Sequence, residues 1–334
     1  WDSFGVSRAA AFSVDGLHST RPIEYPVQAP KDADAMFDVL TYEKGASVLR
    51  MLEQHIGPIV FRDGVRDYLR AHAYGNADTN DLWVSLGKIA KQPVPQLMDG
   101  WIFQPGYPLI TAELREGIEL VLTQQRFTYL PDPSPATWQI PLKMRVIAGG
   151  KTGTSRMLLT EKKTTIPLPH DCESILINEG GHGFYRVRYA PDLLDRILNA
   201  GIDRLASTER FNLINDAWAI TVAGLMPLTD YLDLTARFTA ERDKNVWALL
   251  LDSFSFLNRI ITVENRPAFE AFVRGRVGSA VADMGWEPKN GESELTKQLR
   301  GELIGAQGKL GNDPAIQRRA AELYQAYCND AAAV

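Results

Sequence analysis

Residues 37–52 read FDVLTYEKGASVLRML and decide how the first third of the chain is organised. Apolar side chains recur there at the spacing of one helical face: Val48, Leu49, Leu52 and Ile56. The pair Gly57-Pro58 then interrupts the pattern. The stretch predicts an amphipathic helix over about 41–55, with Tyr42 in its first turn.

Further helices are expected on the C-terminal side of this one. A second apolar face predicts a helix over 61–72, and a third predicts a helix over 80–91 with Thr79 as its N-cap. Residues 1–30 hold Pro22, Pro26 and Pro30, so the end of this opening segment is expected to be extended.

The spacing of hydrophobic residues changes between residues 108 and 190, where short runs of alternating apolar and polar residues replace the helical pattern. Strands are expected over these ranges: 109–114, 118–125, 138–147, 155–160, 163–168, 174–178 and 184–189. Their short spacing predicts a β-sandwich. Gly149-Gly150 and the run 180–183 (GGHG) both suit tight hairpin turns, because glycine adopts positive φ without strain.

From residue 191 the pattern is helical throughout. Helices are expected near 191–200, 208–224, 229–241, 244–264, 267–283, 291–308 and 314–328. Asp313-Pro314 predicts a helix start, with the aspartate as N-cap, and Thr229 is expected to cap the helix from Asp230. Many helices joined by short loops predict a helical solenoid.

Composition excludes several classes of protein. The 334 residues carry 36 Lys and Arg against 41 Asp and Glu, a net charge of -5, so no nucleic-acid partner is expected. With 45% hydrophobic residues the chain has enough apolar surface to fold, and no apolar run approaches the ~20 residues that span a bilayer. No membrane partner is expected. Two distant cysteines, Cys172 and Cys328, suit a reducing compartment, so the expected location is cytoplasmic.

Two groups of residues imitate known binding motifs. Residues 149–152 (GGKT) suggest a phosphate-binding loop, but that motif needs glycine at 145, where Arg145 stands. His170, Cys172, Glu173 and His182 suggest a metal cluster, yet their spacing fits no zinc pattern. We expect a hairpin turn from the first group, and a surface loop and a glycine-rich turn from the second.

The stretch 37–52 resembles the zinc aminopeptidase N family, whose corresponding segment has Phe-Asp and then Tyr-x-Lys-Gly-Ala before an apolar helix. Other segments match in the family's order: 18–23, 76–83, 101–108, 138–142, 183–187 and 210–218. The resemblance implies a multidomain α+β exopeptidase with three parts. Residues 1–107 would be the C-terminal helical part of a thermolysin-like catalytic domain, 108–190 a β-sandwich, and 191–334 a HEAT- or ARM-like α-helical solenoid.

The family binds zinc through H-E-x-x-H and a distant glutamate, and holds the substrate amine with a Gly-Ala-Met-Glu-Asn segment. None of the five histidines here begins H-E-x-x-H, and the amine-binding segment is absent from these 334 residues. Family order puts both motifs before Trp1. The resemblance therefore implies a fragment of a parent enzyme that uses Zn²⁺ to hydrolyse peptides, and we expect no zinc site and no activity in the chain alone. The alternative is a non-catalytic scaffold or interaction module of the same fold.

Tyr42 is the one catalytic residue that the resemblance assigns to this chain. A tyrosine phenol is protonated at neutral pH and can donate a hydrogen bond to the oxyanion of the tetrahedral intermediate. For Asp38 we expect a helix-start carboxylate that could orient its neighbours. Lys44 with Glu43 suggests a catalytic pair, but a structural ion pair is favoured. Gly45 is expected to admit a neighbouring backbone.

Two further expectations concern surfaces. In the helical region, a concave basic patch could receive a peptide's carboxylate. Its candidates are Arg237, Arg242, Arg259, Arg274, Arg276, Arg318 and Arg319. Because the exposed face of residues 1–107 would be apolar without the zinc-bearing part, the fragment is expected to self-associate through it.

Overall fold

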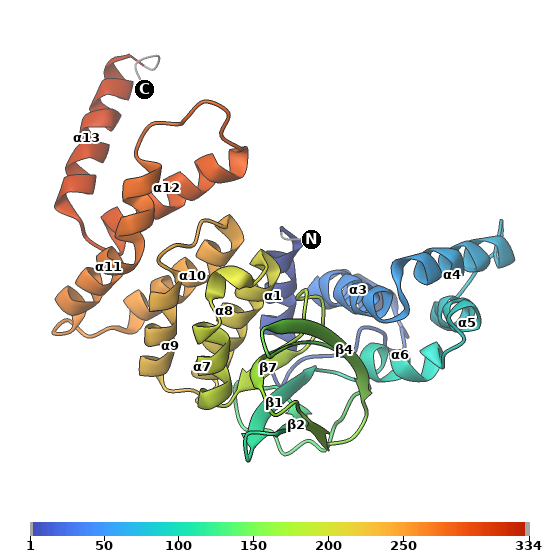
Figure 1. Ribbon diagram of the computed structural model, residues 1–334. Helices are drawn as coiled ribbons and strands as arrows, with labels where there is room; N and C mark the ends of the chain where they lie inside the picture. Colours follow the sequence, from blue (N-terminus) through green and yellow to red (C-terminus); the bar gives the residue numbers. More distant parts are fainter. Residues whose placement is uncertain (1–2, 331–334) are drawn as a thin grey trace. The chain divides into compact units, whose positions relative to one another are not determined.

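The computed structural model describes residues 3–330, and the chain is a mixed α and β protein (Figure 1). It divides into two compact units, residues 1–225 and 226–334. None of the helices within residues 3–330 combines the length and the hydropathy that a membrane crossing requires.

The first unit opens with helices: α1 (Phe4–Asp15), α2 (Pro30–Asp34), the π-helix η1 (Leu40–Lys44), α3 (Gly45–Ile56), α4 (Pro58–Ala71), α5 (Thr79–Ala90) and α6 (Val94–Ile102). The three helices predicted from their apolar faces are present as η1–α3, α4 and α5. Sequence reasoning missed α1, α2 and α6. Helix α1 is rich in small residues and weakly amphipathic, although it buries Ala11 and Phe12, and α2 and α6 are only five and nine residues long.

Helix α5 begins one residue earlier than predicted. Asp78, not Thr79, is its N-cap, and the Asp78 carboxylate accepts hydrogen bonds from the backbone N–H groups of Asn80 and Asp81. Asp81 completes a capping box by accepting from the Asp78 N–H at 2.9 Å. The Thr79 hydroxyl is used differently, since it donates to the carboxylate of Glu24.

Seven strands follow: β1 (Pro108–Arg115), β2 (Glu119–Arg126), β3 (Ile140–Ala148), β4 (Lys151–Leu159), β5 (Lys163–Pro167), β6 (Cys172–Ile177) and β7 (Arg186–Tyr189). They form a four-stranded sheet in the order β5-β2-β1-β7 and a three-stranded sheet in the order β4-β3-β6. Gly149 and Gly150, both at positive φ, make the predicted two-residue hairpin turn between β3 and β4. Residues 149–152, which resemble a phosphate-binding loop in sequence, therefore belong to this turn and to the start of β4.

The second glycine-rich turn differs from the prediction. Gly180 and Gly181 do adopt positive φ, but the strands on either side are not paired as a hairpin. The strand before them, β6, pairs with β3, whereas β7 pairs with β1 of the other sheet in parallel. Residues 178–185 therefore carry the chain from one sheet to the other.

Two helices complete the first unit, α7 (Pro191–Asn199) and α8 (Ser207–Val222), with the 3₁₀ turn η2 (Ile202–Arg204) between them. The second unit holds α9 (Leu228–Thr235), the 3₁₀ turn η3 (Ala236–Phe238), α10 (Lys244–Ile260), α11 (Arg266–Met284), α12 (Glu294–Lys309) and α13 (Pro314–Asn329). Within it, α12 packs against α10, α11 and α13.

The two predicted helix starts in this unit have different outcomes. Asp313 caps α13 as predicted, with its carboxylate accepting from the N–H groups of Ala315 and Ile316. The prediction for α9 was wrong: the helix begins at Leu228, so Thr229 lies inside it and Pro227 occupies the N-cap position.

Candidate functional site

Tyr42 lies in the π-helix η1, where the chain turns into α3. Single π turns occur often at functional sites, because the extra residue changes the direction in which side chains point. The side chain is 55% exposed and lines a hollow of about 610 Å³, so it is not part of the core. We name this hollow the Tyr42 cavity.

The Tyr42 cavity lies between η1, α3 and α5. Gly45, Ala46 and Leu49 supply one wall from the turns after Tyr42, and Leu82 and Trp83 of α5 supply another. Polar groups reach the rim from Glu24, Asp78 and Thr79. A mostly apolar hollow with a few convergent polar groups has the composition of a ligand site.

The segment before Tyr42 is held by Asp38. One oxygen of its carboxylate accepts from the backbone N–H groups of Leu40 at 2.9 Å and Thr41 at 3.0 Å, and it pairs with Arg21 at 2.6 Å. Arg21 also donates to the Thr41 hydroxyl at 3.0 Å. Asp38 is therefore the helix-start carboxylate that the sequence suggested, and it fixes the backbone of the turn that carries Tyr42.

The segment after Tyr42 is held by Lys44, whose side chain is fully buried. Its Nζ lies 2.8 Å from the carboxylate of Asp15, which is also fully buried, and donates to the carbonyl of Gly106 at 3.0 Å. Burial lowers the pKa of Lys44, and the charge of Asp15 acts against this lowering. The structural ion pair expected for Lys44 exists, but its partner is Asp15 of α1 and not Glu43.

Asp15 ties three segments together through the same carboxylate. Its Oδ1 accepts from the Gly106 N–H at 3.1 Å and from the Thr20 hydroxyl at 2.6 Å, while the other oxygen faces Lys44. Sequence reasoning missed Asp15, because its partners Lys44 and Gly106 lie far away along the chain and it ends a helix with no marked apolar face.

The expectation for Gly45 was wrong within the residues that the structure describes. A Cβ atom built at Gly45 would meet no atom within 4 Å. Gly45 borders the Tyr42 cavity instead, so its missing side chain leaves space beside the phenol-bearing turn.

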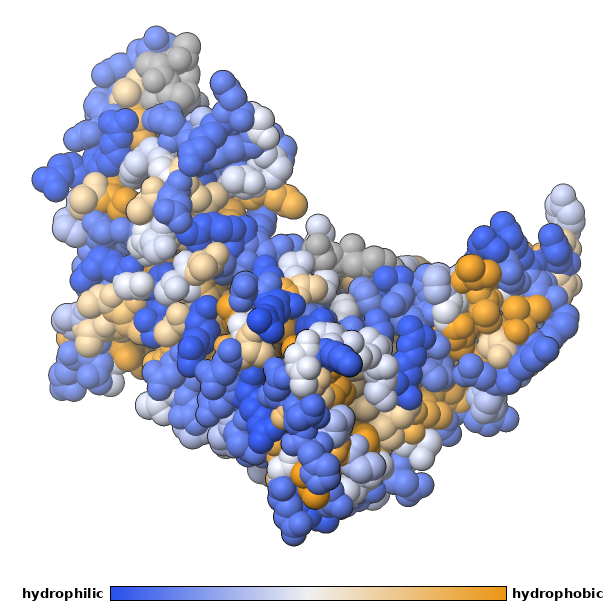
Figure 2. All heavy atoms as spheres, viewed as in Figure 1, coloured by the Kyte–Doolittle hydropathy of each residue, from blue (hydrophilic) through white to orange (hydrophobic). Residues whose placement is uncertain are grey.

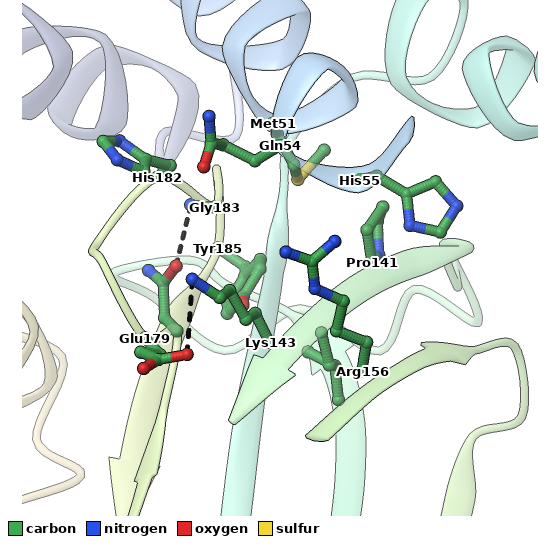
Figure 3. A pocket seen from close by; sticks show the side chains of 12 residues that line it. Met51, Gln54, His55, Pro141, Lys143, Arg156, Glu179, His182, Gly183 and Tyr185 are labelled. Atoms are coloured by element: carbon green, nitrogen blue, oxygen red, sulfur yellow. Dashed lines mark hydrogen bonds and ion pairs between the residues drawn. The ribbon is translucent and has the colours of Figure 1, made fainter. Parts of the chain in front are cut away.

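A second, narrower pocket lies where α3 meets the three-stranded sheet (Figure 3). Gln54 and His55 reach it from α3, Lys143 from β3, and His182 from the 178–185 connection. Lys143 pairs with Glu179 at 3.3 Å. Burial lowers the pKa of His182 to about 4, and the positive charges of Arg50, Arg8 and Lys143 lower it further in the same direction.

The suggested metal cluster is not assembled. Within residues 3–330, no group of three or more His, Cys, Asp or Glu side chains is placed to hold a metal ion. The donor set that zinc requires is therefore not found in this part of the chain, and a zinc ion does not fit the described residues.

Most of the suggested basic residues in the second unit have local partners. Arg242 pairs with Asp283, and Arg276 donates to the Thr235 hydroxyl at 3.1 Å. The others engaged in this way are Arg259 over the Phe256 ring, Arg274 with the Gly311 carbonyl and Arg319 with Glu322. These contacts do not gather the guanidinium groups toward one ligand.

Hydrophobic side chains gather on one face of α4 and α5 (Figure 2). Exposed large apolar residues on these helices are Ile59, Leu69 and Val84. The apolar surface expected in residues 1–107 is present there.

Comparisons with known proteins match two segments of the chain to family models and up to 99% of the chain to individual relatives. Residues 1–101 match the Peptidase family M1 domain, and residues 174–334 match the ERAP1-like C-terminal domain. Aminopeptidase M1 of Arabidopsis thaliana is 31% identical over 99% of this chain and 39% of its own length. Glutamyl aminopeptidase of Rattus norvegicus is 32% identical over 94% of this chain and 34% of its length. Leucyl aminopeptidase of Saccharolobus solfataricus is 34% identical over 73% of this chain and 30% of its own length. The chain thus spans between 30% and 39% of the length of these relatives.

Proposed function

Since this chain belongs to the aminopeptidase N family, peptidase family M1, we propose that it is part of a zinc-dependent enzyme that removes N-terminal residues from peptides. The names of the relatives support the activity, and their greater length supports a parent with additional residues. The zinc ligands of that parent would come from outside the 334 residues. The chain alone is then expected to be inactive.

The position of Tyr42 is the observation that carries the proposal. Its phenol lies on an open, mostly apolar cavity rather than in the core, and the turn that bears it is anchored on both sides. A tyrosine kept only for packing would have no need of such anchoring beside an open hollow.

The proposed chemistry needs one hydrogen bond from this chain. As the first peptide bond of the substrate is attacked, negative charge develops on its carbonyl oxygen. The Tyr42 hydroxyl donates to that oxygen and stabilises the tetrahedral intermediate. Because the turn is anchored through Asp38 and Lys44, the donor is positioned before the charge appears.

The domain division follows the same proposal. Residues 1–107 would complete the catalytic domain, 108–190 would form a β-sandwich, and 191–334 would form a HEAT-like α-helical solenoid. The proposed location is cytoplasmic. None of these assignments is needed for the role of Tyr42.

The proposal is tested by substitution in the full-length parent. Tyr42→Phe should lower kcat about 100- to 1,000-fold with zinc content unchanged, because one oxyanion donor is worth about 2.7–4 kcal/mol. Tyr68→Phe, on the same cavity but on α4, is the matched control and should retain near-wild-type kcat. A parent without an H-E-x-x-H motif, or with no turnover at all, would favour the scaffold alternative.

A further inference from the structure

A third hollow, of about 430 Å³, lies between the two sheets and is open to solvent on one side. Leu120 of β2 and Ile166 of β5 line it from the four-stranded sheet, and Met144, Val146 and Ile175 line it from the three-stranded sheet. The size lies within the roughly 300–1,000 Å³ range of small-molecule pockets. We name it the intersheet cavity. It is formed by residues remote in sequence from Tyr42.

The side chains of β4 explain why space is left there. Residues directly opposite each other in an antiparallel pair point to the same face. The register pairs Met157 with Leu142, Ser155 with Met144, Gly153 with Val146, and Lys151 with Ala148. The inner face of β4 therefore changes along the strand from Leu159 and Met157 to Ser155, Gly153 and Lys151, so bulky apolar residues give way to small and charged ones.

This change is not required by close packing. A Cβ atom built at Gly153 would meet no atom within 4 Å, and its φ is not in the left-handed region. A larger side chain at 153 could therefore fill the gap without strain. The glycine leaves open an apolar space that ordinary packing between sheets would close.

Lys151 gives the cavity its polarity. It is the single charged residue among those that line the cavity, and it lies on the inner face at the hairpin end. Two carboxylates lie against this hairpin, since Glu173 accepts from the Gly150 N–H at 2.7 Å and Asp171 lies beside Gly149. Neither forms an ion pair with Lys151 within residues 3–330. An ammonium group at the mouth of an apolar cavity complements a ligand with an aliphatic body and one anionic end.

We propose that the intersheet cavity binds an aliphatic monocarboxylate, with the chain between the sheets and the carboxylate at Lys151. Each buried methylene should then strengthen binding about fourfold until the cavity is full. The ion pair at the exposed mouth should contribute up to about fivefold.

Isothermal titration of the 334-residue chain with hexanoate, octanoate and decanoate, below their micelle concentrations, tests the chain-length dependence. Decan-1-ol serves as the neutral probe. Gly153→Phe should abolish binding of decanoate and decanol while leaving thermal stability equal or higher. Thr165→Phe, on the exposed face of β5 outside the cavity, is the matched control and should bind normally.

Charge is tested separately. Lys151→Gln should weaken decanoate up to about fivefold and leave decanol unchanged, whereas Lys162→Gln in the next turn should alter neither. Absence of decanoate binding to the wild-type chain, affinity that does not depend on chain length, or undiminished binding to Gly153→Phe would overturn the proposal.

Discussion

The buried pair of Lys44 and Asp15 should hold the Tyr42-bearing turn in place, and Lys44→Met tests this. Both side chains are fully buried and 2.8 Å apart, so bulk solvent does not reach Asp15 to compensate for the lost ammonium group. Removing one partner of a buried pair costs about 3–5 kcal/mol, because the other charge is left uncompensated. We therefore expect the free energy of local opening to fall by about this amount.

Hydrogen exchange measured by mass spectrometry reports that local free energy directly. Peptides covering α1, η1 and α3 should exchange about 150- to 5,000-fold faster in Lys44→Met than in the wild type. Adding Asp15→Asn should recover much of the loss, since the amide oxygen can still accept from Gly106 and Thr20 while the lone charge is removed. The reasoning would be refuted if the two substitutions changed the free energy of local opening additively. It would also be refuted if Lys44→Met alone lowered this free energy by less than about 1 kcal/mol.

Two further predictions concern pH and association. The pKa of His182 is lowered from 6.5 to about 4 in the folded chain. Above pH 6.5 the ring is neutral in both the folded and the unfolded chain. Between pH 6.5 and 4 only the unfolded chain takes up the proton, so the free energy of unfolding falls as the pH falls. Urea unfolding should show that the wild type loses about 1–2 kcal/mol more than His182→Gln over this interval, a value reduced from the full shift because the ring is partly exposed; equal losses would contradict the prediction. The chain should self-associate in light scattering through the face of α4 and α5, and Ile59→Lys with Leu69→Lys should reduce the association. A clean wild-type monomer would contradict that expectation.

Local sequence patterns were sufficient where one segment determines its own structure. The apolar side chains of Val48, Leu52 and Ile56 specify a helix because their spacing places them together on its buried face. Asp313-Pro314 specifies a helix start because the cap and the fixed φ act within the same turn. The Gly149-Gly150 hairpin is predictable for the same reason, since the turn and its strands are contiguous.

Features that depend on distant partners could not be read in this way. The need for positive φ at Gly180 and Gly181 is local, but the sheet that the next strand joins is decided by β1, far away along the chain. Likewise, Lys44 gives no local sign that its partner is Asp15. Tyr42 was found through a family pattern rather than through any property of the residue alone, and its exposure on a cavity became visible only in the structure.

The affinity of a phosphinic dipeptide analogue tests the role of Tyr42 most directly, because its anionic oxygens imitate the oxyanion of the tetrahedral intermediate. In the full-length parent, Tyr42→Phe should weaken this inhibitor about 100- to 1,000-fold while KM for the substrate hardly changes, because the phenol contacts charge that exists only in the transition state. Equal affinity of the two proteins for the analogue would contradict the account.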